Sequence, residues 1–291
     1  MIKIGLVTVS YNSAKVIREF MDSLLPQSYT NWRLYLIDSH SSDETLAILA
    51  KYPDSRISIR AESSNVGFAR GSNLGIKQAL AENCSAIMLI NNDVEFAVNF
   101  LEQMVEELEL SAAEIIAPKM LYFQPPARIW CAGGGFMSQN AWAAYHTGIN
   151  ALDNGQFDSN CYCEFVPLCC ALIKAECFEQ IGDLDEKYFI YSEDADWFYR
   201  AKQAKLRLKY CFRPVILHKV SSLTGGLSSK FAVQIGTRNR VYFIRKNFSG
   251  KLRWGYLAKY FVGMFYFLAK GKYSWREFRW RIPAFFRGLS Y

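Results

Sequence analysis

Short apolar segments alternate with amphipathic segments along the first 118 residues, and this alternation is the feature that most limits the fold. The apolar segments are rich in branched side chains and nearly free of charge, which is typical of buried strands. They cover residues 4–10, 34–37, 57–60, 86–90 and 115–117, and helices are predicted at 16–25, 42–49, 72–82 and 96–108. Strands that are apolar on both faces belong to parallel sheets with helices on each side. The sequence therefore predicts an α/β fold with a mainly parallel sheet.

Polar side chains follow three of these strands at the point where each strand ends. Tyr11 and Asn12 follow the first strand, Asp38 ends the second, and Asp93 comes shortly after residue 90. Ligands of open α/β sheets bind at the carboxyl ends of the strands, so we expect these residues at one shared rim. The sequence has no Gly-x-Gly-x-x-Gly run after the first strand and no Walker-type lysine loop. Dinucleotide-binding and P-loop proteins are therefore disfavoured.

Asp93 has two interpretations. Together with Asn91 and Asn92 it offers the oxygen atoms that Mg²⁺ and Mn²⁺ prefer, with a substrate phosphate completing the coordination shell. Alternatively, Asp93 caps a helix that begins near Phe96. Residue type and spacing leave both interpretations open.

Asp38 also has two interpretations, because serines follow it closely. The carboxylate could bind the base or ribose edge of a nucleotide, or it could cap the next helix. Asp43 is a stronger candidate for a cap alone. Asn12 or Ser13 is predicted to cap the first helix.

Three carboxylates lie within four residues, at Glu193, Asp194 and Asp196, and aromatic side chains flank them. Crowded carboxylates raise the pKa of one of their number, which can make a general base. The alternative is a helix N-terminus that is rich in acidic residues because of the helix dipole. Both interpretations can hold together.

His218 is one of three histidines and closes an apolar segment, so it is either structural or a ligand. The eight cysteines do not form two CxxC pairs, so we interpret them as buried, reduced thiols rather than a zinc site. Residues 120–165 are predicted to be irregular, with a glycine-rich turn or hairpin at 131–135. A buried strand is predicted at 165–174, and two short strands at 206–210 and 215–217.

Basic residues are concentrated at the C-terminal end. Of the 34 Lys and Arg residues, 14 lie in 230–291, and this segment holds one acidic residue, Glu277. Tryptophan and tyrosine favour membrane interfaces, and Lys and Arg favour anionic headgroups. The segment therefore predicts interfacial amphipathic helices at 254–272 and 274–288. Packing against the rest of the chain is the alternative; nucleic-acid binding is less favoured, and a transmembrane helix is not expected.

Taken in their order along the chain, the sequence motifs resemble those of family 2 glycosyltransferases with a GT-A fold, especially the rhamnosyltransferase-like branch of bacterial surface polysaccharide biosynthesis. The resemblance covers about residues 4–245. Its stretches are VTVSYN at 7–12, ID at 37–38, SSD at 41–43, NVGFARGSN at 65–73, LINNDV at 89–94, APK at 117–119, YSEDADW at 191–197, His218, and TRNR at 237–240. The resemblance implies a Rossmann-like GT-A fold with a mixed, mainly parallel sheet.

The resemblance also implies an inverting sugar transfer that uses Mg²⁺ or Mn²⁺. It assigns Asp194 as catalytic base with Glu193 beside it, Asp93 and His218 to the metal, and Asp196 and Trp197 to the acceptor. The donor nucleotide is expected to contact Ser10, Tyr11, Asn12, Asp38, Asn65, Gly67, Arg70, Asn73 and Asn92. The favoured donor is dTDP-rhamnose, with a UDP-hexose as the other option. The acceptor is expected to be a glycan or an undecaprenyl-diphosphate-linked saccharide.

We predict a catalytic domain at 1–229 and a basic, aromatic, helical segment at 230–291. The catalytic domain would have a nucleotide-sugar-binding half at about 1–118 and an acceptor half at about 119–229. The expected location is the cytoplasm, peripherally on the inner face of the bacterial cell membrane, in O-antigen, capsule or cell-wall polysaccharide assembly, with no nucleic-acid partner. The alternative is a catalytically silent module on the same fold that binds a sugar nucleotide or a polyanion.

Overall fold

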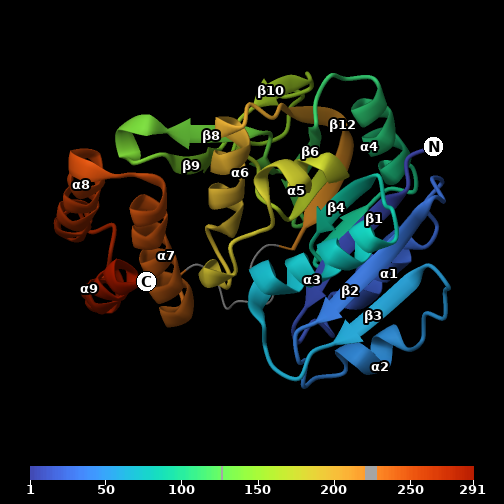
Figure 1. Ribbon diagram of the computed structural model, residues 1–291, viewed down its shortest axis with the longest axis horizontal. Coiled ribbons are helices and arrows are strands. Elements are labelled where there is room, and N and C mark those ends of the chain that lie inside the picture. Colours follow the sequence, from blue (N-terminus) through green and yellow to red (C-terminus); the bar gives the residue numbers. More distant parts are fainter. Residues whose placement is uncertain (126, 220–227) are drawn as a thin grey trace.

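The computed structural model describes residues 1–125, 127–219 and 228–291. At its centre lies a sheet that has ten strands within these residues, with β10-β12-β6-β11-β4-β1-β2-β3 as its main path (Figure 1). Its strands are β1 (Ile4–Ser10), β2 (Trp32–Asp38), β3 (Ile57–Ala61), β4 (Ala86–Ile90), β5 (Val94–Phe96), β6 (Ile115–Tyr122), β7 (Ile129–Cys131), β10 (Cys161–Cys163), β11 (Cys170–Lys174) and β12 (Leu208–His218). Off the main path, β5 pairs with β12 and β7 pairs with β6.

The sheet combines a parallel half with a mixed half. β1 pairs in parallel with β2 and β4, and β2 pairs in parallel with β3. β11 runs antiparallel between β4 and β6, and β12 is parallel to β6. Every side chain of β4 is buried, as expected for a strand covered on both faces. The predicted α/β fold with a mixed, mainly parallel sheet is therefore confirmed.

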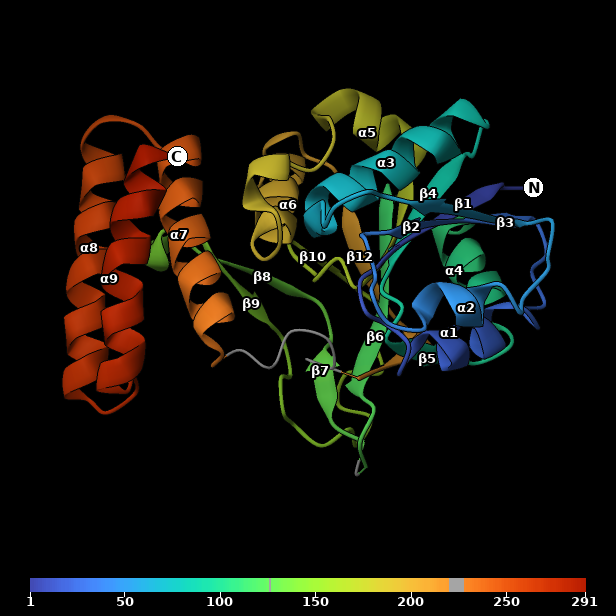
Figure 2. The ribbon, with the colours of Figure 1, turned by 90° about the horizontal axis from the view of Figure 1, so that it is seen from below.

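Helices cover both faces of the sheet (Figure 2). One face carries α3 (Gly67–Ala81), α5 (Ala175–Ile181) and α6 (Glu193–Gln203), and the other carries α1 (Ile17–Leu24), α2 (Thr45–Leu49) and α4 (Phe100–Glu109). The close approach of α3 to β1 depends on Gly75, because a Cβ atom there would lie 2.5 Å from a methyl group of Val7. This packing places the first turn of α3 beside the carboxyl ends of β1 and β2.

Several predicted boundaries are wrong. Residues 94–96 form β5 rather than the start of a helix, and α4 begins at Phe100. The reason is that β5 pairs with β12, so Phe96 reaches the core from a strand and packs near Phe20 and Phe100. The third helix begins at Gly67 rather than near residue 72, and the buried strand predicted at 165–174 is only β11.

β12 and the first helix differ from prediction in detail. β12 is one strand with an irregularity between Cys211 and Val215, where two short strands were predicted. Neither Asn12 nor Ser13 caps α1 with its side chain. The backbone carbonyl of Ser13 instead accepts from the amide of Ile17 at 3.0 Å, because a tight turn precedes the helix.

The segment predicted to be irregular contains a hairpin that lies further along the chain than the one predicted at 131–135, and residues 131–135 instead connect the end of β7 to β8. β8 (Gly134–Met137) pairs antiparallel with β9 (Ala143–His146), and a short 3-10 helix, η1 (Ser138–Asn140), joins them. The hairpin projects from the sheet toward the C-terminal helices (Figure 1). Its tip contacts α8, since Lys259 donates to the carbonyl of Gln139.

The C-terminal segment forms three helices that lie side by side: α7 (Lys230–Asn247), α8 (Gly250–Ala269) and α9 (Trp275–Ser290) (Figure 2). A capping box of Ser274 and Glu277 begins α9. α7 packs on α6, where the rings of Phe243 and Tyr199 lie 5.5 Å apart. The division at residue 229 therefore stays a prediction. Among the described residues, no helix is both long and apolar enough to cross a membrane.

Candidate active site

β1 and β2 end together, and their last side chains are bonded to each other. Ser10 lies opposite Asp38 in the sheet register, and its hydroxyl donates to Asp38 Oδ1 at 2.8 Å. Ser41 donates to the same carboxylate from its amide and from its hydroxyl, at 2.9 and 2.6 Å. Asp38 is only 1% exposed. Its carboxylate therefore ties the loop after β2 to β1, and its contact with a nucleobase stays a prediction.

The loop after β1 presents an aromatic ring at the same rim. Asn12 adopts a φ of 50°, and its side-chain oxygen accepts from the amide of Ser42 at 2.8 Å. The amide of Asn12 donates to Ser41 Oγ at 2.9 Å. Because the two loops are bonded together, the Tyr11 ring, which is 43% exposed, is held at the rim. An exposed ring in this position can stack on a base.

The start of α3 completes this side of the rim. Asn65 Oδ1 accepts from Ser39 Oγ and from the amide of Gly67, both at 3.0 Å. Asn65 and Arg70 are exposed. Asp43 accepts from the amide of Thr45, the first residue of α2, but the N-cap position of this helix is Glu44, one residue later than predicted.

Asp93 and His218 face each other across two paired strands. β5 and β12 pair with Val94 opposite His218, and His218 Nε2 lies 3.1 Å from Asp93 Oδ1. Both side chains are buried, at 6% and 5% exposure. Trp130 packs on the imidazole with 4.3 Å between ring centroids. The structure thus brings together the two residues that were predicted to hold a metal.

This pair is compatible with a divalent cation. Oxygen and imidazole ligands suit Mn²⁺, and neighbouring ligands of an octahedral ion with bonds near 2.1 Å lie about 3 Å apart, as these two atoms do. His218 Nδ1 has no hydrogen-bond partner among the described residues. Throughout residues 1–125, 127–219 and 228–291, no group of three or more His, Cys, Asp and Glu side chains is arranged to hold a metal ion.

Glu193 and Asp194 occupy the first turn of α6. Burial raises the pKa of Asp194 from 3.8 to about 6. Glu193 is 6% exposed, and burial together with the charge of Asp194 raises its pKa well above 4.5. Asp194 retains partial exposure. A partly exposed carboxylate that ionises near pH 6 suits a general base at neutral pH.

The carboxylates of Asp93 and Asp194 both lie near one buried thiol. Burial raises the pKa of Cys169, and nearby charges, among them Asp93 and Asp194, raise it further. The carbonyl of Cys169 accepts from the amide of Asn91 at 2.8 Å, so β11 begins beside the end of β4. The acidic motif and the Asp93–His218 pair therefore approach the same part of the sheet edge.

Asp196 and Trp197, which were predicted to contact an acceptor, point into the protein instead. Both are 0% exposed. Trp197 Nε1 donates to the carbonyl of Gly182 at 3.1 Å. Asp196 accepts from Tyr188, Arg200, Lys246 and Asn247. Asp196 lies two residues beyond Asp194 and therefore belongs to a different face of the helix, and the Trp197 ring is packed in the core, so the predicted acceptor role fits neither residue.

Asn73 and Asn92 also bond within the protein. Asn73 is 2% exposed; its side chain donates to the carbonyl of Leu184 at 2.9 Å and accepts from the amide of the same residue at 3.0 Å. Asn92 donates to the carbonyl of Val9 at 3.1 Å. These side chains connect elements of the fold, so neither is placed in the proposed donor site.

Two sets of residues around the site were missed by sequence analysis. Trp130 lies between His218 and His146, with centroid distances of 4.3 and 5.1 Å, but its segment shows no periodicity that would predict this. Asn239 and Lys246 of α7 bond to the acidic motif and its loop. The TRNR stretch that contains Asn239 was recognised as part of the family resemblance, without a role.

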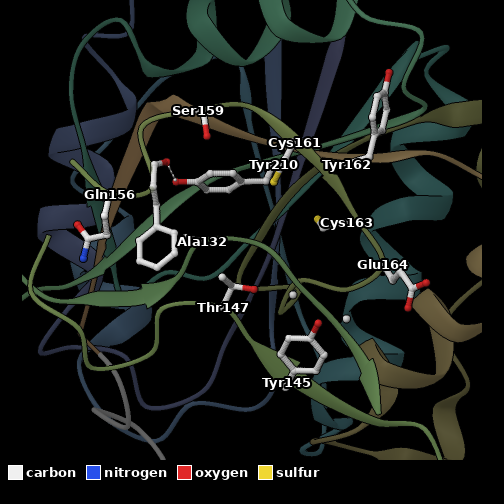
Figure 3. Close-up of a pocket in the computed structure, with 13 residues that line it drawn as sticks. Ala132, Tyr145, Thr147, Gln156, Ser159, Cys161, Tyr162, Cys163, Glu164 and Tyr210 are labelled. Carbon is white, nitrogen blue, oxygen red and sulfur yellow. Dashed lines mark hydrogen bonds between the residues drawn. The ribbon is translucent and has the colours of Figure 1, made fainter. Parts of the chain in front are cut away.

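A cavity of about 290 Å³ lies beside the β8–β9 hairpin and β10. Figure 3 shows its labelled side chains, which mix rings such as Tyr145 with polar groups such as Glu164. The hydroxyl of Tyr210 in its wall donates to the carbonyl of Phe157 at 3.0 Å. None of the predicted site residues lines this cavity, so it is separate from the rim described above.

Solved structures with the same fold include two sugar transferases. The mannosyltransferase PcManGT from Pyrobaculum calidifontis, in complex with GDP-Man and Mn²⁺, is 13% identical and matches 99% of this chain and 86% of that chain, with a TM-score of 0.59. GalNAc-T7 with UDP, GalNAc and Mn²⁺ is 14% identical and matches 84% of this chain and 48% of that chain, with a TM-score of 0.66. The predicted GT-A fold is thereby confirmed.

Curated relatives are similar over much of the chain. O-antigen biosynthesis protein RfbC of Myxococcus xanthus is 22% identical over 229 residues, which are 76% of this chain and 17% of that protein. The low-salt glycan biosynthesis hexosyltransferase Agl10 of Haloferax volcanii is 22% identical over 244 residues, 81% of this chain and 74% of that protein.

The chain is also similar, over a shorter stretch, to WfgD of Escherichia coli, a UDP-Glc:alpha-D-GlcNAc-diphosphoundecaprenol beta-1,3-glucosyltransferase. It is 29% identical over 102 residues, 35% of this chain and 39% of that protein. The chain therefore spans less than half of the length of RfbC and of WfgD. The model of glycosyl transferase family 2 matches residues 6–181, more than half of the chain, and the chain belongs to this family.

Proposed function

We propose that the chain transfers a sugar from a nucleotide diphosphate donor to a hydroxyl group of a glycan or lipid-linked acceptor, in the assembly of a surface polysaccharide. The observation that carries this proposal is Asp194, a partly exposed carboxylate whose pKa is raised to about 6. It approaches the same part of the sheet edge as Asp93 and His218. Membership of family 2 and relatives named for glycan biosynthesis support the same reaction class.

In the proposed reaction Asp194 accepts the proton of the acceptor hydroxyl. The acceptor oxygen forms a bond to the anomeric carbon of the donor while the bond from that carbon to the diphosphate breaks. The electron pair of the broken bond leaves with the nucleoside diphosphate. Attack from the face opposite the leaving group inverts the anomeric configuration, through a transition state with oxocarbenium character.

Glu193 has a separate part in this proposal. Burial and the neighbouring charge raise its pKa well above 4.5, so Glu193 holds its proton more firmly than an ordinary carboxyl group. A neutral Glu193 leaves the negative charge of the pair on Asp194. The more exposed of the two carboxylates is then the one that receives the proton from the acceptor.

Asp93 and His218 are the proposed ligands of a divalent cation. When bound there, the cation would neutralise charge on the leaving diphosphate. GalNAc-T7 and PcManGT, which share this fold, were solved with Mn²⁺ together with a nucleotide or nucleotide sugar, which supports Mn²⁺ or Mg²⁺ here. Arg70, exposed in the first turn of α3, is the proposed cationic contact of the diphosphate.

The proposed donor site comprises Tyr11, Asp38, Asn65 and Arg70, with Ser10 and Asn12 holding the first two in place. Both uracil and guanine nucleotides occur among the similar proteins, as UDP-Glc for WfgD, UDP for GalNAc-T7 and GDP-Man for PcManGT. The favoured donor stays dTDP-rhamnose, on the resemblance to rhamnosyltransferases, with a UDP-hexose as the second candidate. Asp38, at the end of β2, is the residue proposed to bind the nucleobase of the donor.

The C-terminal helices are proposed to bind an anionic membrane surface, where a lipid-linked acceptor would lie. Exposed apolar side chains are spread over α8 and α9: Leu252, Trp254, Val262, Phe265, Tyr266, Trp275 and Phe286. They accompany the concentration of Lys and Arg residues in 230–291. Aromatic and basic side chains together favour the headgroup region. WfgD, whose name specifies a diphosphoundecaprenol-linked acceptor, supports an acceptor of this class.

The experiment that tests the proposed function measures thermal stability with UDP, dTDP, GDP and CMP, each with and without Mn²⁺. A nucleotide that binds only the native state raises its stability in proportion to ln(1 + [L]/Kd). We expect a metal-dependent increase with one nucleoside diphosphate, followed by sugar transfer from the matching donor. The variant Asp194→Asn should bind the donor but lose turnover by about 10²-fold or more. Nucleotide binding without transfer by the wild-type protein would support the alternative, a catalytically silent binding module.

A further inference from the structure

The backbone that leads into the acidic motif is strained. Phe189 has φ 67° and ψ −61°, and the amide of Ile190 donates to the carbonyl of Tyr188 at 2.8 Å. These values describe a γ-turn of the rare type with positive φ. Tyr191 and Ser192 follow with φ of 67° and 69°. Residues other than glycine keep such angles only where the surrounding structure holds them.

The side chain of Asn239, on α7, stabilises this strained backbone through hydrogen bonds. It is 0% exposed. Its Nδ2 donates to the carbonyls of Tyr188, Ile190 and Tyr191 at 3.0, 2.8 and 2.6 Å. An amide group has two N–H bonds, so one of them is shared between two carbonyls. These three carbonyls belong to the strained turn itself.

The orientation of the Asn239 amide is fixed from the other side. The guanidinium of Arg238 donates to Asn239 Oδ1 at 2.7 Å and to the carbonyl of Tyr188 at 2.8 Å. Asn239 Oδ1 is therefore occupied as an acceptor, and Nδ2 must face the turn. Two consecutive residues of the TRNR stretch thus bind one turn of backbone.

The segment 185–196, which contains the strained turn, is also contacted by α3 on its opposite side and by Lys246 near both of its ends. A Cβ atom on Gly67 would lie 2.4 Å from the Phe189 ring, and the amide of Ala69 donates to the carbonyl of Phe189 at 3.2 Å. Lys246 of α7 joins Asp185 and Asp196 at 2.7 and 2.8 Å. Gly67, which was predicted to contact the donor, therefore makes room for the loop.

We propose that Asn239 is a positioning residue for the base: its amide holds the strained turn at 188–192, and this turn sets the place and the burial of Asp194. The inference rests on the proposed function of Asp194. Loss of the amide releases the three carbonyls to water and lets the turn relax toward ordinary backbone angles. Asp194 then moves and becomes better hydrated, while the donor loops after β1 and β2 keep their own bonds.

The test compares wild type with Asn239→Ala and Asn239→Ser, and with Gln234→Ala as the control. Gln234 is a partly exposed amide residue on the same helix, outside this network. In the two Asn239 variants we expect kcat to fall by about 10²-fold, as for a displacement of about 1 Å, with the donor KM and nucleotide Kd within about twofold. The acid limb of the pH–rate profile should also move to lower pH, because hydration lowers the pKa of a buried carboxyl.

Unchanged kcat and an unchanged pH profile in a folded Asn239→Ala protein would overturn the proposal, as would an equal loss in Gln234→Ala. Loss of fold in both Asn239 variants would overturn it too, since the residue would then be structural only. If the wild-type protein transfers no sugar, the proposed function fails by itself. Amide hydrogen exchange at 188–194 then decides the positioning role: faster exchange in the Asn239 variants supports it, and equal exchange refutes it.

Discussion

Replacing the proposed base should make the protein more stable while it removes activity. Asp194 is held in a partly buried place where burial raises its pKa from 3.8 to about 6. The folded protein therefore binds this proton more tightly than the unfolded chain does. Above pH 6 the group is ionised in both states, and the folded state bears the cost of a poorly hydrated charge. Asp194→Asn removes that charge and keeps the shape of the side chain.

The size of the effect follows from the pKa change. A tenfold change in proton affinity corresponds to about 1.4 kcal/mol, so the rise from 3.8 to about 6 corresponds to a cost on the order of 3 kcal/mol. This is an upper limit, because Asp194 retains partial contact with solvent, which screens its charge. Linkage fixes the sign: the cost is fully present above pH 6, about half of it remains near pH 5, and it disappears below pH 4.

Urea unfolding at several pH values between 4 and 8 measures this difference directly. Asp194→Asn should exceed wild type in unfolding free energy by up to about 3 kcal/mol at pH 8, and the gain should shrink as the pH falls. Glu179→Gln, which removes an exposed carboxylate, is the matched control. A variant that is equally stable at pH 8, or whose gain does not depend on pH, would refute the claim that Asp194 is held at an energetic cost.

Three further expectations concern activity and binding. The kcat/KM of sugar transfer should fall about tenfold per pH unit below pH 6, as Asp194 becomes protonated; a flat profile from pH 5 to 7.5 would exclude it as the base. Asp93→Asn should remove the Mn²⁺-dependent part of nucleotide binding in calorimetry, and retained metal dependence would move the metal elsewhere. The double change Trp254→Ala and Trp275→Ala should reduce sedimentation with anionic vesicles at low salt; Leu110→Ala, equally apolar and 81% exposed far from these helices, should not.

Much of the fold follows from local pattern. A run such as residues 86–90 is buried on both faces wherever it lies in a parallel sheet, so its strand character can be read without knowing its neighbours. Val94–Phe96 is different, because its strand character depends on pairing with β12, more than a hundred residues later. Its apolar spacing also fits a helix, and sequence periodicity alone could not separate the two.

Sequence could predict a site residue where the type of side chain alone indicates its chemistry. It could not predict which of two similar side chains faces the site. Asp93, Asp194 and His218 carry their chemistry in their side-chain type, and the fold brings them to one edge. Asp196 is chemically identical to Asp194 and lies two residues away, yet it is 0% exposed. The difference depends on the face of α6 to which each side chain belongs, and that face is set by packing against α7.

The placement of α7 has a consequence for the basic segment as a whole. Its inner face carries Asn239 and Lys246, which bond to the loop and helix of the acidic motif. Its other side receives α9, where a Cβ atom on Gly288 would lie 2.6 Å from Val241. α8 and α9 thus lie one helix away from the proposed base.

Deleting residues 250–291 would remove the packing partner of α7 and so disturb Asp194. A loss of activity in that deletion variant would then give no information about membrane binding. Substitutions of exposed rings such as Trp254 leave that packing intact, so they can separate surface binding from catalysis.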